Sequence, residues 1–245
     1  MNSLIWQSAC IAGLLMLVVW NRSEIGDPKW PLIGVGVMVC AWLLLALTII
    51  VSSLWRFSHG IQGNTLSIVS LVLAVVPIFA VVAFVITAQK APAIHDISTD
   101  TTNPPEFVLA KQSRHHSHNS LSYDSANVPL QSQAYPHIKP VIISQEPPVV
   151  MVSVMAAMNK LGWQLHKNDS DVGSANDALV VEAYIKTPLL GFVDDVVVRI
   201  TPEESGTSRI DVRSVSRIGV SDLGANAERI RLFLNVLSGQ INGQE

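Results

Sequence analysis

Charged side chains alternate with apolar ones along two neighbouring segments near the C-terminus, residues 191–200 and 209–217. Successive side chains of a β-strand point to opposite faces of a sheet, so a period of two separates the apolar set from the charged set. The pattern therefore predicts a small area in which carboxylates and guanidinium groups gather. Its members are Asp195, Arg199, Asp211, Arg213 and Arg217. We expect a candidate site on this face.

Two binding or structural interpretations of this charged face are open. In the first, the residues form cross-strand ion pairs on a solvated sheet face, and each pair contributes roughly 0.2–1 kcal/mol. In the second, the face binds an anionic ligand or a lipid headgroup, because Arg199, Arg213 and Arg217 can each bind a phosphate or carboxylate through two N–H groups. A helix expected from about residue 225 would add a positive helix N-terminus.

A third interpretation is a hydrolase or metal-dependent enzyme that uses His95 and Asp96 together with Asp194 and Asp195. Adjacent carboxylates in a strand point to opposite faces, so they cannot readily act as one pair. The sequence lacks the nucleophile-elbow, HExxH, P-loop and dinucleotide-binding motifs. We therefore favour a binding or assembly module over an enzyme, and expect no cofactor.

Three histidines, His115, His116 and His118, lie close together in a segment rich in Ser and Asn. Histidine ligands of a metal need a fixed geometry and usually a Cys or carboxylate partner. No Cys is near them in the sequence, so a solvated loop is favoured over a metal site.

Nucleic-acid binding is not expected. Residues 91–245 carry more Asp and Glu than Lys and Arg, and aromatic residues make up only 6% of the chain. Binding to nucleic acid needs a basic surface or aromatic stacking platforms.

The elements that would position the charged face form one C-terminal domain, residues 146–245. A helix is expected over 146–161, because Pro147 and Pro148 suit a first helical turn and apolar residues recur every three or four positions. Strands are expected at 163–167, 178–187, 191–200 and 209–217, and a last helix at 225–238. This order predicts an α+β two-layer domain, with helices over the apolar face of an antiparallel sheet.

The first ninety residues are much more apolar than the rest. Only 14% of the chain is charged, against roughly 25% in soluble domains, and the mean hydropathy is +0.38. Residues 4–20, 31–55 and 65–88 contain no Asp, Glu, Lys or Arg. A helix crosses a bilayer with about 20 apolar residues, within a range of roughly 17–25. We therefore expect a membrane protein in which residues 1–90 form three transmembrane α-helices.

Several segments together resemble one family: residues 94–107, 134–136, 191–195 and 211–226. They are similar to the domain-of-unknown-function family numbered fourteen ninety-nine, over roughly residues 92–240. The resemblance implies no established reaction. It implies a bacterial protein whose domain lies outside the cytosol, so we expect a multi-pass protein of the bacterial inner membrane with a periplasmic C-terminal domain. Membrane lipid and a membrane-protein partner are the expected partners, beside the anionic ligand.

The segment between the two regions, residues 91–145, is extended and rich in Pro, Ser and His. The resemblance implies that its first part, residues 94–107, packs on the domain, which would place His95 and Asp96 near the sheet. The His-rich stretch near residues 111–120 departs from the family pattern, so the resemblance assigns it no role.

Overall fold

The structure is a computed structural model. It describes residues 29–60, scattered positions between 69 and 86, and residues 91–242 apart from 167–172, 176–177 and 188–190. The chain divides into two compact units. The first is Met1–Lys90 with Leu189–Gly191, and the second is Ala91–Pro188 with Phe192–Glu245.

The described part of the first unit is mainly one long helix, α2 (Lys29–Ser58). Ala46 and Ile49 are buried in a small apolar cluster with Trp42, Leu45 and Ile78. Other apolar side chains of this helix are exposed, Leu47 among them.

The expectation of a membrane protein with three transmembrane helices is wrong. Among the residues that the structure describes, no helix has the length and apolar character needed to cross a membrane. Helix α2 contains the second apolar run, 31–55; the first run, 4–20, lies outside the described residues, as does most of the third, 65–88. The prediction rested on three runs without Asp, Glu, Lys or Arg, on the polar connections between them and on Trp residues at their ends.

The second unit is built on a seven-stranded antiparallel sheet with the order β1-β7-β6-β5-β3, in which β2 also pairs with β7 and β4 with β5. The long strands are β5 (Ala178–Lys186), β6 (Val193–Glu203) and β7 (Thr207–Ser216). The short strands are β1 (Asp96–Ser98), β2 (Val141–Ile143), β3 (Gln164–Leu165) and β4 (Gly173–Ala175).

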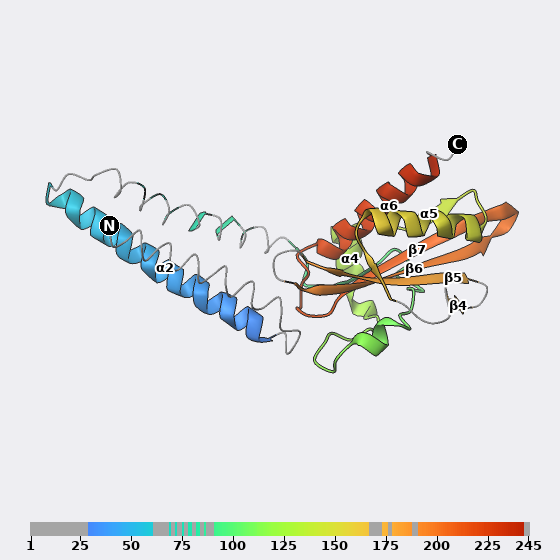
Figure 1. Cartoon of the computed structure of the whole chain (residues 1–245), viewed down its shortest axis with the longest axis horizontal. Helices are drawn as coiled ribbons and strands as arrows, with labels where there is room; N and C mark the ends of the chain where they lie inside the picture. Colours follow the sequence, from blue (N-terminus) through green and yellow to red (C-terminus); the bar gives the residue numbers. More distant parts are fainter. Residues whose placement is uncertain are drawn as a thin grey trace. The chain divides into compact units, whose positions relative to one another are not determined.

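Helices α5 (Pro147–Lys160) and α6 (Ala225–Asn242) cover one face of this sheet (Figure 1). Alternate residues of the strands, such as Val196 and Val198, pack there against the apolar sides of both helices. Trp163 stacks on Phe233 of α6 with ring centroids 5.1 Å apart. This layer holds the main core.

The opposite face is covered by residues 99–123, which we call the strap (Figure 1). The strap contains a short 3-10 helix, η1 (Ala110–Ser113). A second 3-10 turn, η2 (Ser125–Asn127), and helix α4 (Val128–Ala134) follow it. Phe107 and Ala110 of the strap pack on Val197 and Val215 in a small apolar cluster. The charged sheet face is therefore buried under the strap. The expected ion pairs are present, such as Arg199 with Asp211 and Arg217 with Asp195, but the expectation that they lie on a solvated face is wrong.

The edge of strand β1 is closed by a side chain. The carboxamide of Gln131, from α4, accepts a hydrogen bond from the Ser98 amide (3.1 Å) and donates one to the Ser98 carbonyl (2.7 Å). Gln131 thus takes the place of another strand, which leaves this part of β1 unable to pair with a second chain.

Candidate functional site

Arg213 joins the sheet to both ends of the strap. Its Nε and Nη2 donate to the two carboxylate oxygens of Asp96, at 2.9 and 2.7 Å. Its Nη1 donates to the carbonyl of Pro105 (3.1 Å), and Nη2 also donates to the carbonyl of Leu121 (2.8 Å). Arg213 is only 2% exposed. Four of the five N–H groups of a guanidinium are thus used inside the domain.

Two aromatic rings of the strap complete this arrangement. The guanidinium carbon of Arg213 lies 5.2 Å from the ring centroids of both Phe107 and Tyr123, within the range of cation–π attraction. Burial, and then the negative charge of Asp96, raise the pKa of Tyr123 to about 12, so its hydroxyl remains protonated. We call Arg213, Asp96 and the two rings the clasp.

The side chain of Glu182, in β5, binds main-chain amides of the strap. Its two carboxylate oxygens accept hydrogen bonds from the amides of Val108, Leu109 and Ala110, at 2.6–3.0 Å. These amides lie at the start of η1, where N–H groups have no partner inside the helix. A buried carboxylate therefore satisfies three donors at once.

Asp195 of β6 is the centre of a second network. It accepts hydrogen bonds from Nε of Arg114 (2.8 Å), from Nε and Nη2 of Arg217 (3.0 and 2.8 Å) and from Nε2 of His166 (3.2 Å). Burial by itself would raise the pKa of Asp195, but the hydrogen bonds of His166 and Arg217 and the charges of Arg114 and Arg217 outweigh it and hold the pKa at about 2. One carboxylate therefore serves two guanidinium groups.

A third network fixes the beginning of the strap. Asp211 accepts from Nη2 of Arg199 (2.9 Å) and from Nε of Arg209 (3.2 Å). Nη2 of Arg209 also donates to Asp100 of the strap (2.8 Å). The other carboxylate oxygen of Asp100 accepts from the amides of Thr102 and Asn103, which closes a turn. Arg199 donates in addition to the carbonyl of Asn103 (2.8 Å).

The residues of the enzyme interpretation are not brought together. Asp194 pairs with Arg229 of α6, whereas Asp195 lies on the strap side of the sheet. The carbonyl of His95 accepts hydrogen bonds from the amide of Ser216 (2.9 Å) and from the side chain of Asn226 (2.9 Å). Within the described ranges, no group of three His, Cys, Asp or Glu side chains could hold a metal ion.

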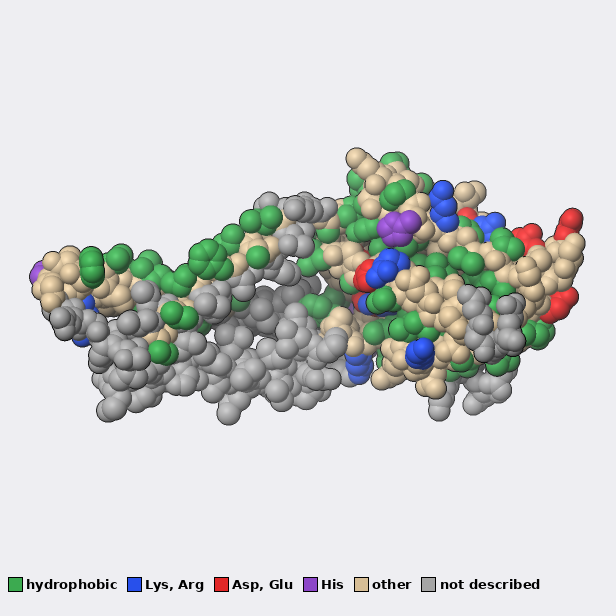
Figure 2. Space-filling view, turned by 90° about the horizontal axis from the view of Figure 1, so that it is seen from above, with side chains coloured by type: hydrophobic (Ala, Val, Ile, Leu, Met, Phe, Trp, Pro, Cys, Tyr) green, Lys and Arg blue, Asp and Glu red, His purple; other side chains and the backbone are tan. Residues whose placement is uncertain are grey.

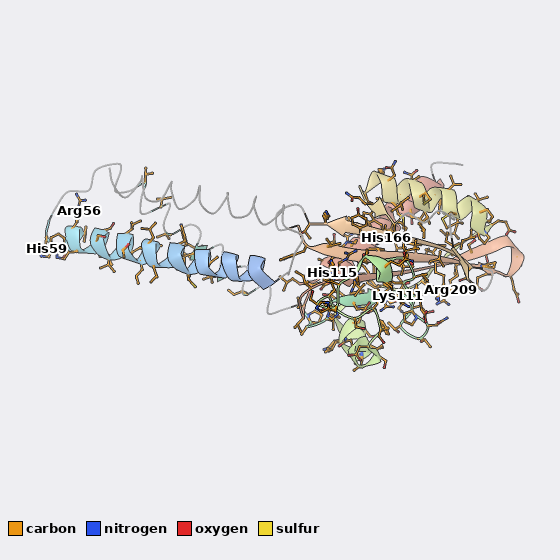
Figure 3. All side chains as sticks on the ribbon, turned by 60° about the horizontal axis from the view of Figure 1, so that its bottom comes forward. Arg56, His59, Lys111, His115, His166 and Arg209 are labelled. Carbon is orange, nitrogen blue, oxygen red and sulfur yellow. The ribbon has the colours of Figure 1, made fainter. Side chains whose placement is uncertain are left out.

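An open groove of about 620 Å³ lies on this side of the unit; strap residues line it, together with Arg213 of the sheet. Arg213 is the only one of the three sequence-predicted arginines among the residues that line it. Figure 3 shows two other lining residues, Lys111 and His115, on the strap below the sheet. The basic and histidine side chains of the groove are Lys111, Arg114, His115, His116, His118 and Arg213, and its one acidic side chain is Glu106.

His118 lines the groove and is partly buried there. Burial, and then the charges of Arg217 and Arg114, lower the pKa of His118 below its ordinary value of 6.5. Its Nδ1 accepts a hydrogen bond from the amide of His115 (3.1 Å). The proton of the neutral ring is then on Nε2, which can donate to a ligand.

Several residues of these networks and of the groove were not predicted as site residues, among them Lys111, Arg114 and Arg209. Lys111 and Arg114 lie in the His-rich stretch to which sequence reasoning assigned no role, and the hydrogen bond from Arg114 to Asp195 joins residues 81 positions apart. The alternation of β7 did carry a signal for Arg209, because it shares a face with Asp211 and Arg213.

The comparison with protein families agrees with this C-terminal unit. Residues 96–237 match the family described as "Protein of unknown function (DUF1499)". The match covers more than half of the chain and includes both the sheet and the strap. A fusion of this domain to three transmembrane helices is not confirmed. A comparison with the curated proteins finds no match. The chain therefore belongs to the DUF1499 family of proteins of unknown function.

Proposed function

We propose that the C-terminal unit is a binding module that takes an anionic ligand in the groove of the strap. The observation that carries the proposal is the shared carboxylate: Arg114 and Arg217 both pair with Asp195, so one of the two positive charges is not balanced there. Arg114 also lines the groove, beside exposed Lys111. Basic side chains outnumber the acidic Glu106 in this groove, and a surface with an excess of one charge sign concentrates ligands of the opposite sign.

The ligand would contact the strap rather than the arginines of the sheet. The guanidinium of Arg213 donates its hydrogen bonds to Asp96 and to strap carbonyls. The guanidinium of Arg199 is likewise engaged, by Asp211, Asp100 and the carbonyl of Asn103. Their role in this proposal is to hold the strap in place. Lys111 and the Nε2 of His118 are two groups of the groove that can donate to the ligand directly.

Binding of inorganic phosphate to the full chain, measured by isothermal titration calorimetry, tests the proposal. Lys111→Ala should weaken binding about fivefold to tenfold, because it removes one charged donor, which contributes about 1 kcal/mol in a partly exposed site. Binding should also weaken as the salt concentration rises. Lys139→Ala is the matched control, since Lys139 is an exposed lysine that does not line the groove.

The proposal predicts a loss in Lys111→Ala and wild-type affinity in Lys139→Ala. Equal affinity in all three proteins, or no phosphate binding to the wild type, would show that the groove is not an anion site.

A further inference from the structure

The groove lies next to a second loop, residues 217–224. Asn119, which lines the groove, donates from its side chain to the carbonyls of Ser216 (3.1 Å) and Gly219 (2.9 Å). Its amide donates to the carbonyl of Arg217 (2.7 Å). The two loops are therefore hydrogen-bonded side by side at one end of the sheet.

The second loop is well fixed but presents apolar side chains to solvent. The hydroxyl of Ser221 donates to the carbonyl of Pro92 (2.9 Å), and the amide of Asp222 donates to the carbonyl of Ile94 (3.1 Å). Val220 is nevertheless 76% exposed and Leu223 47% exposed. Single exposed apolar residues are common, so exposure alone decides nothing.

The backbone of Leu223 makes its position unusual. Its φ is 55°, in the left-handed region, which costs roughly 1–2 kcal/mol for a residue other than Gly, Asn or Asp. Leu223 lies in the turn that begins α6, where Asp222 accepts hydrogen bonds from the amides of Gly224, Ala225 and Asn226, and its large apolar side chain remains about half exposed. Strain of this kind is often kept where a ligand is bound.

We propose that the ligand of the groove is an anionic lipid, whose headgroup lies in the groove and whose acyl chains contact Val220 and Leu223. This inference rests on the proposed anion site. Its basis is that a positively charged groove and a fixed apolar loop are hydrogen-bonded to each other. An anionic lipid has the matching arrangement, a negatively charged headgroup joined directly to apolar chains.

The charges at the two ends of the sheet agree with this orientation. The β6–β7 hairpin, with exposed Glu203 and Glu204, lies at the opposite end of these strands from the loop 217–224. Figure 2 shows acidic side chains at that far end of the unit. An anionic lipid surface would be repelled there and attracted at the end with the groove.

The test uses two soluble ligands that share a headgroup, and the lipid is kept below its critical micelle concentration. One is dihexanoylphosphatidic acid, and the other is glycerol 3-phosphate, which has the same phosphate without acyl chains. We expect the full chain to bind the lipid at least about tenfold more tightly, which is the effect of about 1.4 kcal/mol of apolar contact. Dihexanoylphosphatidylcholine, whose headgroup has no net charge, should bind more weakly than the phosphatidic acid.

Two variants locate the acyl contact. Val220→Ser and Leu223→Asn should each reduce the ratio of the two affinities, and Asn tolerates the left-handed backbone at position 223. Val152→Ser is the matched control, because Val152 is 65% exposed on α5, on the other face of the sheet. Any contact of the acyl chains with other apolar residues is the same in the wild type and in the variants, so it does not affect the comparison of their affinity ratios.

The outcomes separate the two proposals. If the two ligands bind equally well and Lys111→Ala weakens both, the anion site stands and the lipid inference is wrong. The inference is also wrong if Val220→Ser and Leu223→Asn keep the wild-type ratio. If glycerol 3-phosphate does not bind at all, the anion site itself is wrong. If the phosphatidylcholine binds as tightly as the phosphatidic acid, the lipid's negative charge is not recognised and the lipid inference is wrong.

Discussion

Replacing Arg213 tests whether the charged face is a buried clasp or a set of surface ion pairs. Arg213→Met leaves the carboxylate of Asp96 buried without its partner and leaves the carbonyls of Pro105 and Leu121 without their donors. Breaking a buried ion pair in this way costs about 3–5 kcal/mol. A domain has only about 5–15 kcal/mol of unfolding free energy, so the variant should lose a large share of its stability.

If the charged face were instead a set of surface ion pairs, the loss of unfolding free energy would be clearly smaller. An exposed pair contributes about 0–1 kcal/mol, and the exposed pair of Arg231 with Glu228 provides the control in the variant Arg231→Met. Urea unfolding of the full chain, followed by circular dichroism, gives the free energies. Hydrogen exchange over residues 105–123 shows whether the strap is released.

A milder variant keeps the test usable if Arg213→Met does not fold. Arg213→Lys keeps the charge but cannot reproduce the two parallel bonds to Asp96, so it should cost about 1–3 kcal/mol and raise exchange in the strap. If Arg213→Lys lowers the unfolding free energy no more than Arg231→Met does, and the strap remains protected in each, the clasp does not hold the strap and our reasoning is refuted.

Two further predictions concern the other buried carboxylates. Glu182→Gln should cost about 1–3 kcal/mol in urea unfolding, because its NH2 group would face the amide of Ala110, a donor that then has no acceptor; an unchanged midpoint would contradict this. The pKa of Asp195, about 2, lies below the ordinary 3.8, so its ion pairs stabilise the fold above pH 4, by about 2 kcal/mol, and this contribution is lost as the pH falls through 2. The deficit of Asp195→Asn relative to wild type should therefore shrink between pH 4 and pH 2, and a deficit that does not change with pH would contradict the assignment.

The three long strands and the helices α5 and α6 follow from local patterns in the sequence, whereas the short strands β1, β2 and β4 were not predicted. The period of two in β6 and β7 separates Asp194 from Asp195, and the structure has the first against α6 and the second against the strap. The ends of the elements were predicted less well. Helix α6 continues to Asn242, beyond the expected end at residue 238, because Ile241 still packs against the core.

The strap could not be derived from periodicity. It contains one short 3-10 helix, and its position depends on contacts such as Arg213 with Asp96, which are 117 residues apart. A contact that does reach the strap is that of Arg213 with the carbonyl of Pro105, 108 residues away. Alternation placed the charged residues on one face but did not show what covers that face. For the same reason the three arginines were expected to meet a ligand, whereas only Arg213 lines the groove, and its donors are largely used by the clasp.

The predicted periplasmic location of the C-terminal unit and a membrane-protein partner stay predictions. The lipid inference does not require transmembrane helices, since it concerns side chains of the C-terminal unit alone.

The most direct test of the central claim is to map where an anion binds. The full chain, labelled with ¹⁵N, is titrated with inorganic phosphate while its amide signals are followed by NMR. Our account predicts that the largest shifts fall on the part of the strap that lines the groove, residues 111–123. Shifts centred instead on Arg199, Arg209 and Asp211, or no shifts in the strap at saturating phosphate, would contradict it.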